Sequence, residues 1–128
     1  MNNVNDDHAP DLIALTGTIT SQISILFNKG DGTFMTPSTS DSFRILPITL
    51  SIGDLDNDKK LDLVVVNLFT TTAITVLFNY GNGTFMKPIQ YQTDEAPYFL
   101  SIADMNNDDK LDIVVGYVYS NNISILFN

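Results

Sequence analysis

The residues with the clearest chemical potential are aspartates and asparagines at alternate positions of three short loops. Residues 54–62 carry carboxylates at loop positions one, three, five and nine. Residues 104–112 and 3–11 repeat the pattern, with asparagine in place of some aspartates. Oxygen atoms on alternate residues of a tightly curled loop can point to one centre, and Ca²⁺ takes about six to eight such hard ligands. The spacing therefore predicts three calcium-binding loops.

The predicted ligands are the side chains at positions one, three, five and nine and the backbone carbonyl at position seven. They are Asp54, Asp56, Asp58, Lys60 and Asp62 in the middle loop, Asp104, Asn106, Asp108, Lys110 and Asp112 in the last, and Asn3, Asn5, Asp7, Ala9 and Asp11 in the first. Neighbouring carboxylates repel one another, and a divalent cation removes that repulsion. The loops hold four, three and two carboxylates, so we expect calcium affinity to fall in that order.

Two other kinds of loop also contain such residues. Aspartate and asparagine also mark ordinary turns, but a turn does not require ligand-type residues at each of these positions in three loops. An EF-hand needs flanking helices and a glutamate at loop position twelve. The chain has Ala14, Val65 and Val115 there, so the EF-hand is excluded.

Composition excludes several other classes of function. Fifteen acidic residues against six Lys and Arg give a net charge of −9, which is the wrong sign for binding nucleic acid. The chain has no cysteine, so it can form neither disulfides nor thiolate metal sites. No run of eighteen apolar residues occurs, and we therefore expect no membrane insertion by this segment.

Catalysis is not expected either. His8 is the only histidine, and it lies at loop position six, where a side chain tends to face solvent. Without a second base no nucleophilic triad can be assembled, so the chain is predicted not to be an enzyme. Aromatic rings with a polar group suit stacking on sugars, and the tyrosines that could do so are Tyr80, Tyr91, Tyr98, Tyr117 and Tyr119.

The elements that position the loops are set by an internal repeat. Ile-Ser-Ile-Leu-Phe-Asn at residues 23–28 returns as residues 74–79 and 123–128, and Gly-Asp-Gly-Thr-Phe-Met-Thr-Pro at 30–37 returns at 81–88 with two substitutions. The unit is about fifty residues long. A period of this length is typical of repeat folds such as propellers and solenoids.

Four short apolar runs occupy one unit, at residues 48–52, 61–66, 74–78 and 89–91. They are rich in β-branched residues and separated by an Asp-rich loop, a stretch of Thr and Asn, and an Asn-Gly or Asp-Gly turn, which predicts four antiparallel strands. Consecutive valines at 64–66 imply burial on both sheet faces, as in stacked propeller blades. The more polar run at 89–91 is expected to be the outermost strand.

This pattern predicts an all-β chain of four-stranded antiparallel propeller blades, with approximate blades 1–46, 47–96 and 97–128. Ten strands are expected, which is about two and a half blades, whereas propellers close with about four to eight. We therefore expect the chain to be a partial propeller and a piece of a longer protein. Alone, it is expected to be marginally stable or to self-associate through uncovered blade faces and edges.

The loops, the Gly-rich turns and the Ile-Ser-Ile-Leu-Phe-Asn strands resemble FG-GAP repeats of the VCBS type, found in integrin α-subunit propellers. The resemblance covers nearly all of the chain. It implies a seven- or eight-bladed propeller in the parent protein, Ca²⁺ in the loops, and an extracellular or cell-surface location. The family usually has glycine at loop position six, where this chain has His8, Lys59 and Asp109.

The function expected from these features is a calcium-binding propeller module for extracellular adhesion or protein–protein interaction, with Ca²⁺ mainly structural. Its partner is expected to be a protein or glycan ligand at the cell surface. The alternative is a carbohydrate-binding, lectin-like propeller.

Overall fold

The computed structural model describes residues 3–16, 22–36, 38–39, 47–67, 73–93 and 96–128. These residues form strands and no helix. The strands are β1 (Leu12–Thr16), β2 (Gln22–Leu26), β3 (Ser38–Thr39), β4 (Pro47–Gly53), β5 (Asp62–Asn67), β6 (Ile74–Leu77), β7 (Ile89–Tyr91), β8 (Pro97–Ala103), β9 (Asp112–Tyr117) and β10 (Ile123–Leu126). The predicted all-β class is confirmed.

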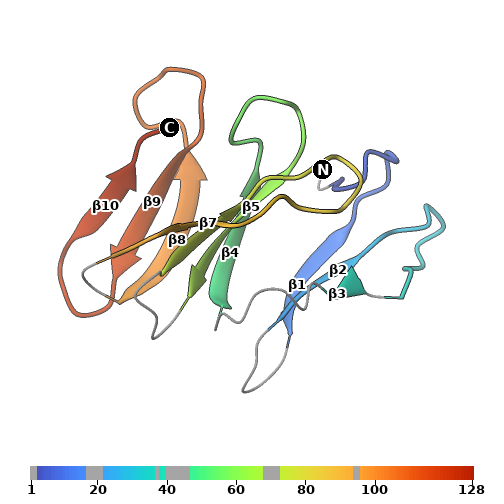
Figure 1. Ribbon diagram of the computed structural model, residues 1–128, viewed down its shortest axis with the longest axis horizontal. Coiled ribbons are helices and arrows are strands. Elements are labelled where there is room, and N and C mark those ends of the chain that lie inside the picture. The colour runs from blue at the N-terminus through green and yellow to red at the C-terminus, as the bar shows by residue number, and fades with distance from the viewer. Residues whose placement is uncertain (1–2, 17–21, 37, 40–46, 68–72, 94–95) are drawn as a thin grey trace.

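Within the described residues the strands form three antiparallel sheets, and strands that are consecutive in the chain are neighbours. The first sheet contains β1 to β3, the middle sheet β4 to β7, and the third sheet β8 to β10. The repeat preserves the register, since Leu12 faces Leu26, Leu63 faces Leu77, and Ile113 faces Leu126. Figure 1 shows the middle sheet lying between the other two.

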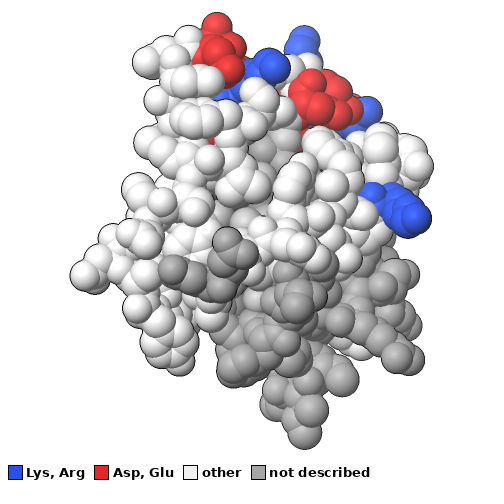
Figure 2. Space-filling view, turned by 60° about the vertical axis from the view of Figure 1, so that its left-hand side comes forward, with Lys and Arg blue, Asp and Glu red and all other residues white. Residues whose placement is uncertain are grey.

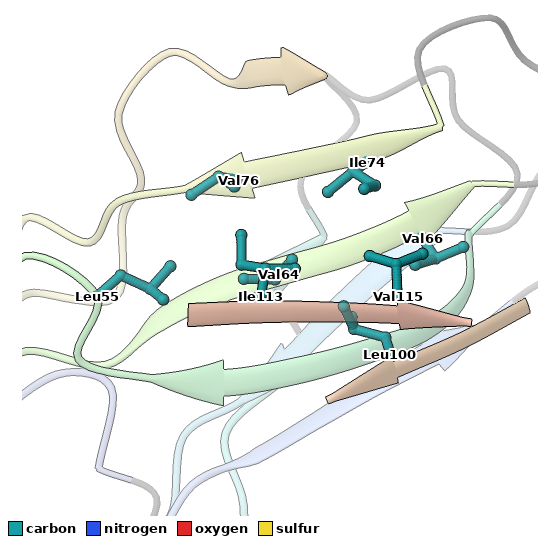
Figure 3. Packing of buried hydrophobic residues seen from close by; sticks show 8 residues of the cluster. All are labelled: Leu55, Val64, Val66, Ile74, Val76, Leu100, Ile113 and Val115. Carbon is teal, nitrogen blue, oxygen red and sulfur yellow. The ribbon is translucent and has the colours of Figure 1, made fainter. Parts of the chain in front are cut away.

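The core lies in two layers, one on each face of the middle sheet. Successive side chains of a strand point to opposite faces, so Leu63 and Val65 pack against the first sheet while Val64 and Val66 pack against the third. All four are fully buried, which confirms the predicted burial on both faces. Figure 3 shows the second layer, which joins β5 and β6 to Leu100, Ile113 and Val115 of the third sheet.

Strand β7 is exposed along its whole length, as its polar sequence predicts. It pairs only with β6 among the described strands. The middle sheet therefore runs from its first strand, β4, to a solvated outer strand.

The three Asp-rich loops precede equivalent strands of the three sheets. Residues 3–11 precede β1, the loop after β4 leads into β5, and the loop after β8 leads into β9. In Figure 1 these loops lie along the same edge of the stack. Acidic side chains gather at that edge in the space-filling view of Figure 2, so the fold concentrates negative charge at one end of the molecule.

Candidate metal centre

Each Asp-rich loop is curled by two residues in the left-handed backbone conformation. In the middle loop these are Asn57 at position four, with a φ of 61°, and Lys59 at position six, with a φ of 70°. The first and last loops repeat both turns at Asp6, His8, Asn107 and Asp109. Position six is therefore left-handed although none of the three loops has glycine there, and the loop keeps its shape.

The curl is held by side-chain oxygens that accept hydrogen bonds from the loop's own backbone. Asp54 accepts from the N–H of Asp58 at 3.0 Å and from the N–H of Lys59 at 2.8 Å. Asp56 accepts from the N–H of Asp58 at 3.3 Å, and Asp58 accepts from the N–H of Lys60 at 2.9 Å. These bonds turn the carboxylates toward the inside of the loop.

As a result, oxygen atoms of Asp54, Asp56 and Asp58 lie within 4.8 Å of one another. It is the one such group of three found among the described residues. Hard carboxylate oxygens at this separation suit a cation such as Ca²⁺ in their chemistry, so the residues at positions one, three and five fit the predicted metal.

The last and first loops share this geometry but carry fewer charges. The N–H of Asp108 donates to Asp104 and Asn106, both at 3.2 Å, and the N–H groups of Lys110 and Ala9 donate to Asp108 and Asp7 at position five. The first loop repeats the same bonds with Asn3, Asn5 and Asp7. The position-three amides of Asn106 and Asn5 also donate to the position-five carboxylates at 3.0 and 2.8 Å. A neutral donor thus stands where the middle loop has a third anion.

In the middle loop one carboxylate is paired with a lysine. The Lys60 ammonium lies 2.6 Å from Asp58, and this is the one ion pair found in the described part of the chain. The hydrogen bond from this ammonium, followed by that from the Lys60 N–H, lowers the pKa of Asp58. The hydrogen bond from the ammonium to Asp58 also raises the pKa of Lys60. The pair partly neutralises the cluster.

The aspartate at position nine lies at the base of the loop, apart from the group of three. Asp62 is buried, and its two oxygens accept hydrogen bonds from the N–H groups of Leu55 and Asn79, both at 2.9 Å. Burial raises the pKa of Asp62, while these two bonds oppose the rise. Each oxygen keeps a second lone pair, so a ligand role for Asp62 stays a prediction. The same clamp recurs at Asp11 and Asp112.

Asn79 and Asn128, each two residues after the end of β6 or β10, connect neighbouring loops. This role was not predicted from the sequence. Asn79 is buried, and its amide donates to the carbonyl of Leu61 at 3.1 Å and to that of Val4, in the first loop, at 2.8 Å. Asn128 donates in the same way to Leu111 and to Leu55. The recurrence of this asparagine was visible, but its partner becomes apparent only when the sheets are stacked.

Together these bonds form a continuous path between the three loops. In each loop the N–H of the residue at position two donates to the aspartate at position nine of the same loop. In the first two loops the carbonyl of that residue also accepts a hydrogen bond from the asparagine of the next sheet. The path runs through Asp11, Val4, Asn79, Asp62, Leu55, Asn128, Asp112 and Met105. The candidate metal loops are thus fixed to one another as well as to their own sheets.

Comparison with known families agrees with this repeated geometry. The family model described as FG-GAP-like repeat matches residues 3–65 and again residues 54–115. Searches of curated proteins and of solved structures found no match. Among the described residues, no helix has the length and apolar character needed to cross a membrane. The two family matches together cover most of the chain, which therefore belongs to the FG-GAP-like repeat family.

Proposed function

We propose that the chain is a calcium-binding repeat module whose three sheets are consecutive blades of a β-propeller. The observation that carries the proposal is the cluster of Asp54, Asp56 and Asp58 oxygens inside a curled loop. The two neighbouring loops have the same hydrogen-bond pattern, which supports one common role for all three.

Ca²⁺ would be held in the middle loop by Asp54, Asp56 and Asp58, with the Lys60 carbonyl and Asp62 as the remaining predicted ligands. The ion would neutralise the carboxylates and fix the loop that joins β4 to β5. A ligand that binds only the folded state stabilises it by RT ln(1 + [L]/Kd), or about 2.7 kcal/mol at a hundredfold excess over Kd. Calcium is therefore proposed to act mainly on stability.

The proposed setting is extracellular or at the cell surface, in adhesion or protein–protein interaction, without enzymatic activity. Family membership supports an interaction module. The acidic charge supports a cation rather than nucleic acid as partner. A protein or glycan ligand is the proposed macromolecular partner.

Thermal unfolding with and without chelator tests this proposal. Chelation should lower the melting temperature of the wild type. In Asp58→Ala, the part of this fall that comes from the middle loop should be largely lost. Asp31→Asn is the matched control, because Asp31 is an exposed acid whose hydrogen bonds to described residues stay within its own turn, at Thr33. A folded wild type whose melting temperature ignores chelator would show that the loops are ordinary turns.

A glycan-binding role is the second candidate, favoured by a hollow beside the middle loop. The hollow has a volume of about 480 Å³, and its lining includes Asn3, Asp6, Asp58, Lys60 and Tyr80. The Tyr80 side chain is 59% exposed there, and an aromatic ring beside polar groups suits a sugar. A glycan array should then show binding that Tyr80→Ala removes. Tyr119→Ala, at an exposed tyrosine that does not line the hollow, should leave the binding unchanged.

A further inference from the structure

The two outer sheets each present an apolar face that no described residue covers. The middle sheet provides the comparison, because Leu63 on one of its faces and Ile74 on the other are fully buried. Their counterparts one repeat away, Leu12 on the first sheet and Ile123 on the third, are 48% and 67% exposed. Equivalent positions are thus core in the middle sheet and surface at the two ends of the stack (Figure 1).

The two exposed faces are complementary, because each is one half of the interface that already joins neighbouring sheets. We call the exposed face of the first sheet the leading face. Its residues occupy the same repeat positions as the middle-sheet residues that pack on the first sheet. It consists of Leu12, Ala14, Leu26 and Phe34. We call the exposed face of the third sheet the trailing face. Its residues occupy the same repeat positions as the middle-sheet residues that pack on the third sheet. It consists of Val114, Ile123, Ile125 and Phe127.

A glycine turn shows how such faces fit together inside the molecule. Gly83 packs directly on the ring of Phe27, since a Cβ at Gly83 would lie 2.2 Å from the ring. Phe85 of the same turn packs into the core layer between the first and middle sheets. This turn therefore inserts into the preceding sheet at Phe27, the residue that directly follows β2.

The first sheet carries the same turn, and no described residue packs on its second glycine. Gly30 and Gly32 have φ values of 83° and 86°, close to the 92° and 80° of Gly81 and Gly83. The hydrogen bonds match as well. The N–H of Lys29 donates to the carbonyl of Thr33 at 2.9 Å, and the N–H of Tyr80 donates to the carbonyl of Thr84 at the same distance. No atom lies within 4 Å of a Cβ placed on Gly32, and Phe34 is 41% exposed. The turn is therefore preformed for a contact that the described residues do not supply.

The trailing face offers the receiving ring. Phe127 follows β10 as Phe27 follows β2, and it is 63% exposed. A second correspondence lies beside it. Asn79 and Asn128 each donate to the position-two carbonyl of the loop in the preceding sheet. Asn28 is the equivalent asparagine of the first sheet, and Met105 is at position two of the last loop. If the first sheet of one copy lay on the third sheet of another, the same bond would join the Asn28 amide to the Met105 carbonyl.

We propose that the leading face of one copy of this chain stacks on the trailing face of a second copy, with Gly32 against Phe127 and the Asn28 amide donating to the Met105 carbonyl. The contact continues the interface that joins the sheets within one chain. Stacking adds no strand to either outer sheet. Because the two faces differ, the contact is head-to-tail and leaves one free face at each end, so it leads to closed rings or filaments.

Sedimentation velocity of the full chain and two face variants tests the proposal. The wild type should associate with rising concentration, while Phe34→Asp, which blocks the leading face, and Phe127→Asp, which blocks the trailing face, should each be monomeric. An equimolar mixture of the two variants should form one-to-one dimers and nothing larger, because each variant keeps the face that the other has lost. Tyr119→Asp, at a 90% exposed residue outside both faces, should associate like the wild type.

Two outcomes would overturn the proposal. One is a wild type that stays monomeric at every concentration, and the other is a variant mixture that stays monomeric while the wild type associates. Circular dichroism verifies that the variants are folded. If either variant loses its β-sheet signal, Leu12→Glu replaces Phe34→Asp and Ile123→Glu replaces Phe127→Asp. Leu12 is more exposed than Phe34, and Ile123 is more exposed than Phe127.

Discussion

Lys59 occupies a left-handed backbone conformation, with a φ of 70°, at loop position six. This conformation costs an ordinary L-residue about 1–2 kcal/mol, whereas aspartate and asparagine tolerate it better and glycine adopts it freely. Lys59→Gly should therefore stabilise the protein by about 1 kcal/mol, and Asp109→Gly by clearly less. Denaturant unfolding at saturating calcium measures both, and equal effects would show that strain at position six is not the cause.

The inter-sheet asparagine gives a second prediction at this scale. Asn79→Ala removes the hydrogen bonds to Val4 and Leu61 in a buried environment, and it should cost about 2–3 kcal/mol of unfolding free energy. Asn28→Ala, measured at low protein concentration where the chain is monomeric, is the control, because Asn28 is less buried and its amide bonds to Pro10 within its own sheet. We expect a cost of about 1 kcal/mol there. Similar losses in the two variants would contradict a specific role for the bond between sheets.

At the residue scale the sequence was informative about local spacing and uninformative about contacts between sheets. Alternate aspartates predicted the group of Asp54, Asp56 and Asp58, because the loop's own backbone holds those side chains. The clamp at Asp62 depends on the N–H of Asn79, which is seventeen residues away and adjoins the loop only when β5 and β6 pair. Periodicity reveals that such residues recur without showing what they bond.

At the scale of the elements, the two glycine turns form a matched pair. Gly32 and Gly83 have nearly the same positive φ, so Gly→Ala causes similar backbone strain in both. Only Gly83 faces the Phe27 ring. Gly83→Ala should therefore be more destabilising than Gly32→Ala by about 1–3 kcal/mol, the usual cost of overpacking. Parallel thermal melts at low protein concentration give the difference, and its absence would show that the contact contributes little.

The three loops should differ in affinity in the order of their carboxylates. The middle loop has four at ligand positions, the last three and the first two, and fewer anionic ligands weaken the attraction for a cation. Calorimetric titration of variants in which two loops are disabled at position five isolates each site. Equal affinities would show that charge count does not control binding.

The strands were more predictable than the loops that join them. The expected runs at 61–66 and 89–91 correspond to β5 at Asp62–Asn67 and β7 at Ile89–Tyr91. Their composition reflects burial directly, since β5 is covered on both faces and β7 is solvated. The left-handed turn at Lys59 could not be read from its residue type, because lysine has no preference for that conformation. It follows from the hydrogen bonds that the aspartates impose on the loop.

For the whole molecule, stacking the sheets brings three acidic loops to one edge (Figure 1). The net charge of −9 would fall to −3 with three bound Ca²⁺, since three ions add six positive charges. The apolar layers hold the sheets together, while like charges at the loop edge oppose them. A cation at that edge would therefore stabilise both the individual loops and the stack.

Equilibrium dialysis against radioactive calcium tests the central claim most directly, because it counts ions bound per folded chain. The account predicts saturable binding, with the tightest site lost in Asp54→Asn/Asp58→Asn and retained in the Asp31→Asn control. Circular dichroism on the same samples verifies that each variant is folded. Absence of saturable binding by the folded wild type, or binding unchanged in the double variant, would contradict it.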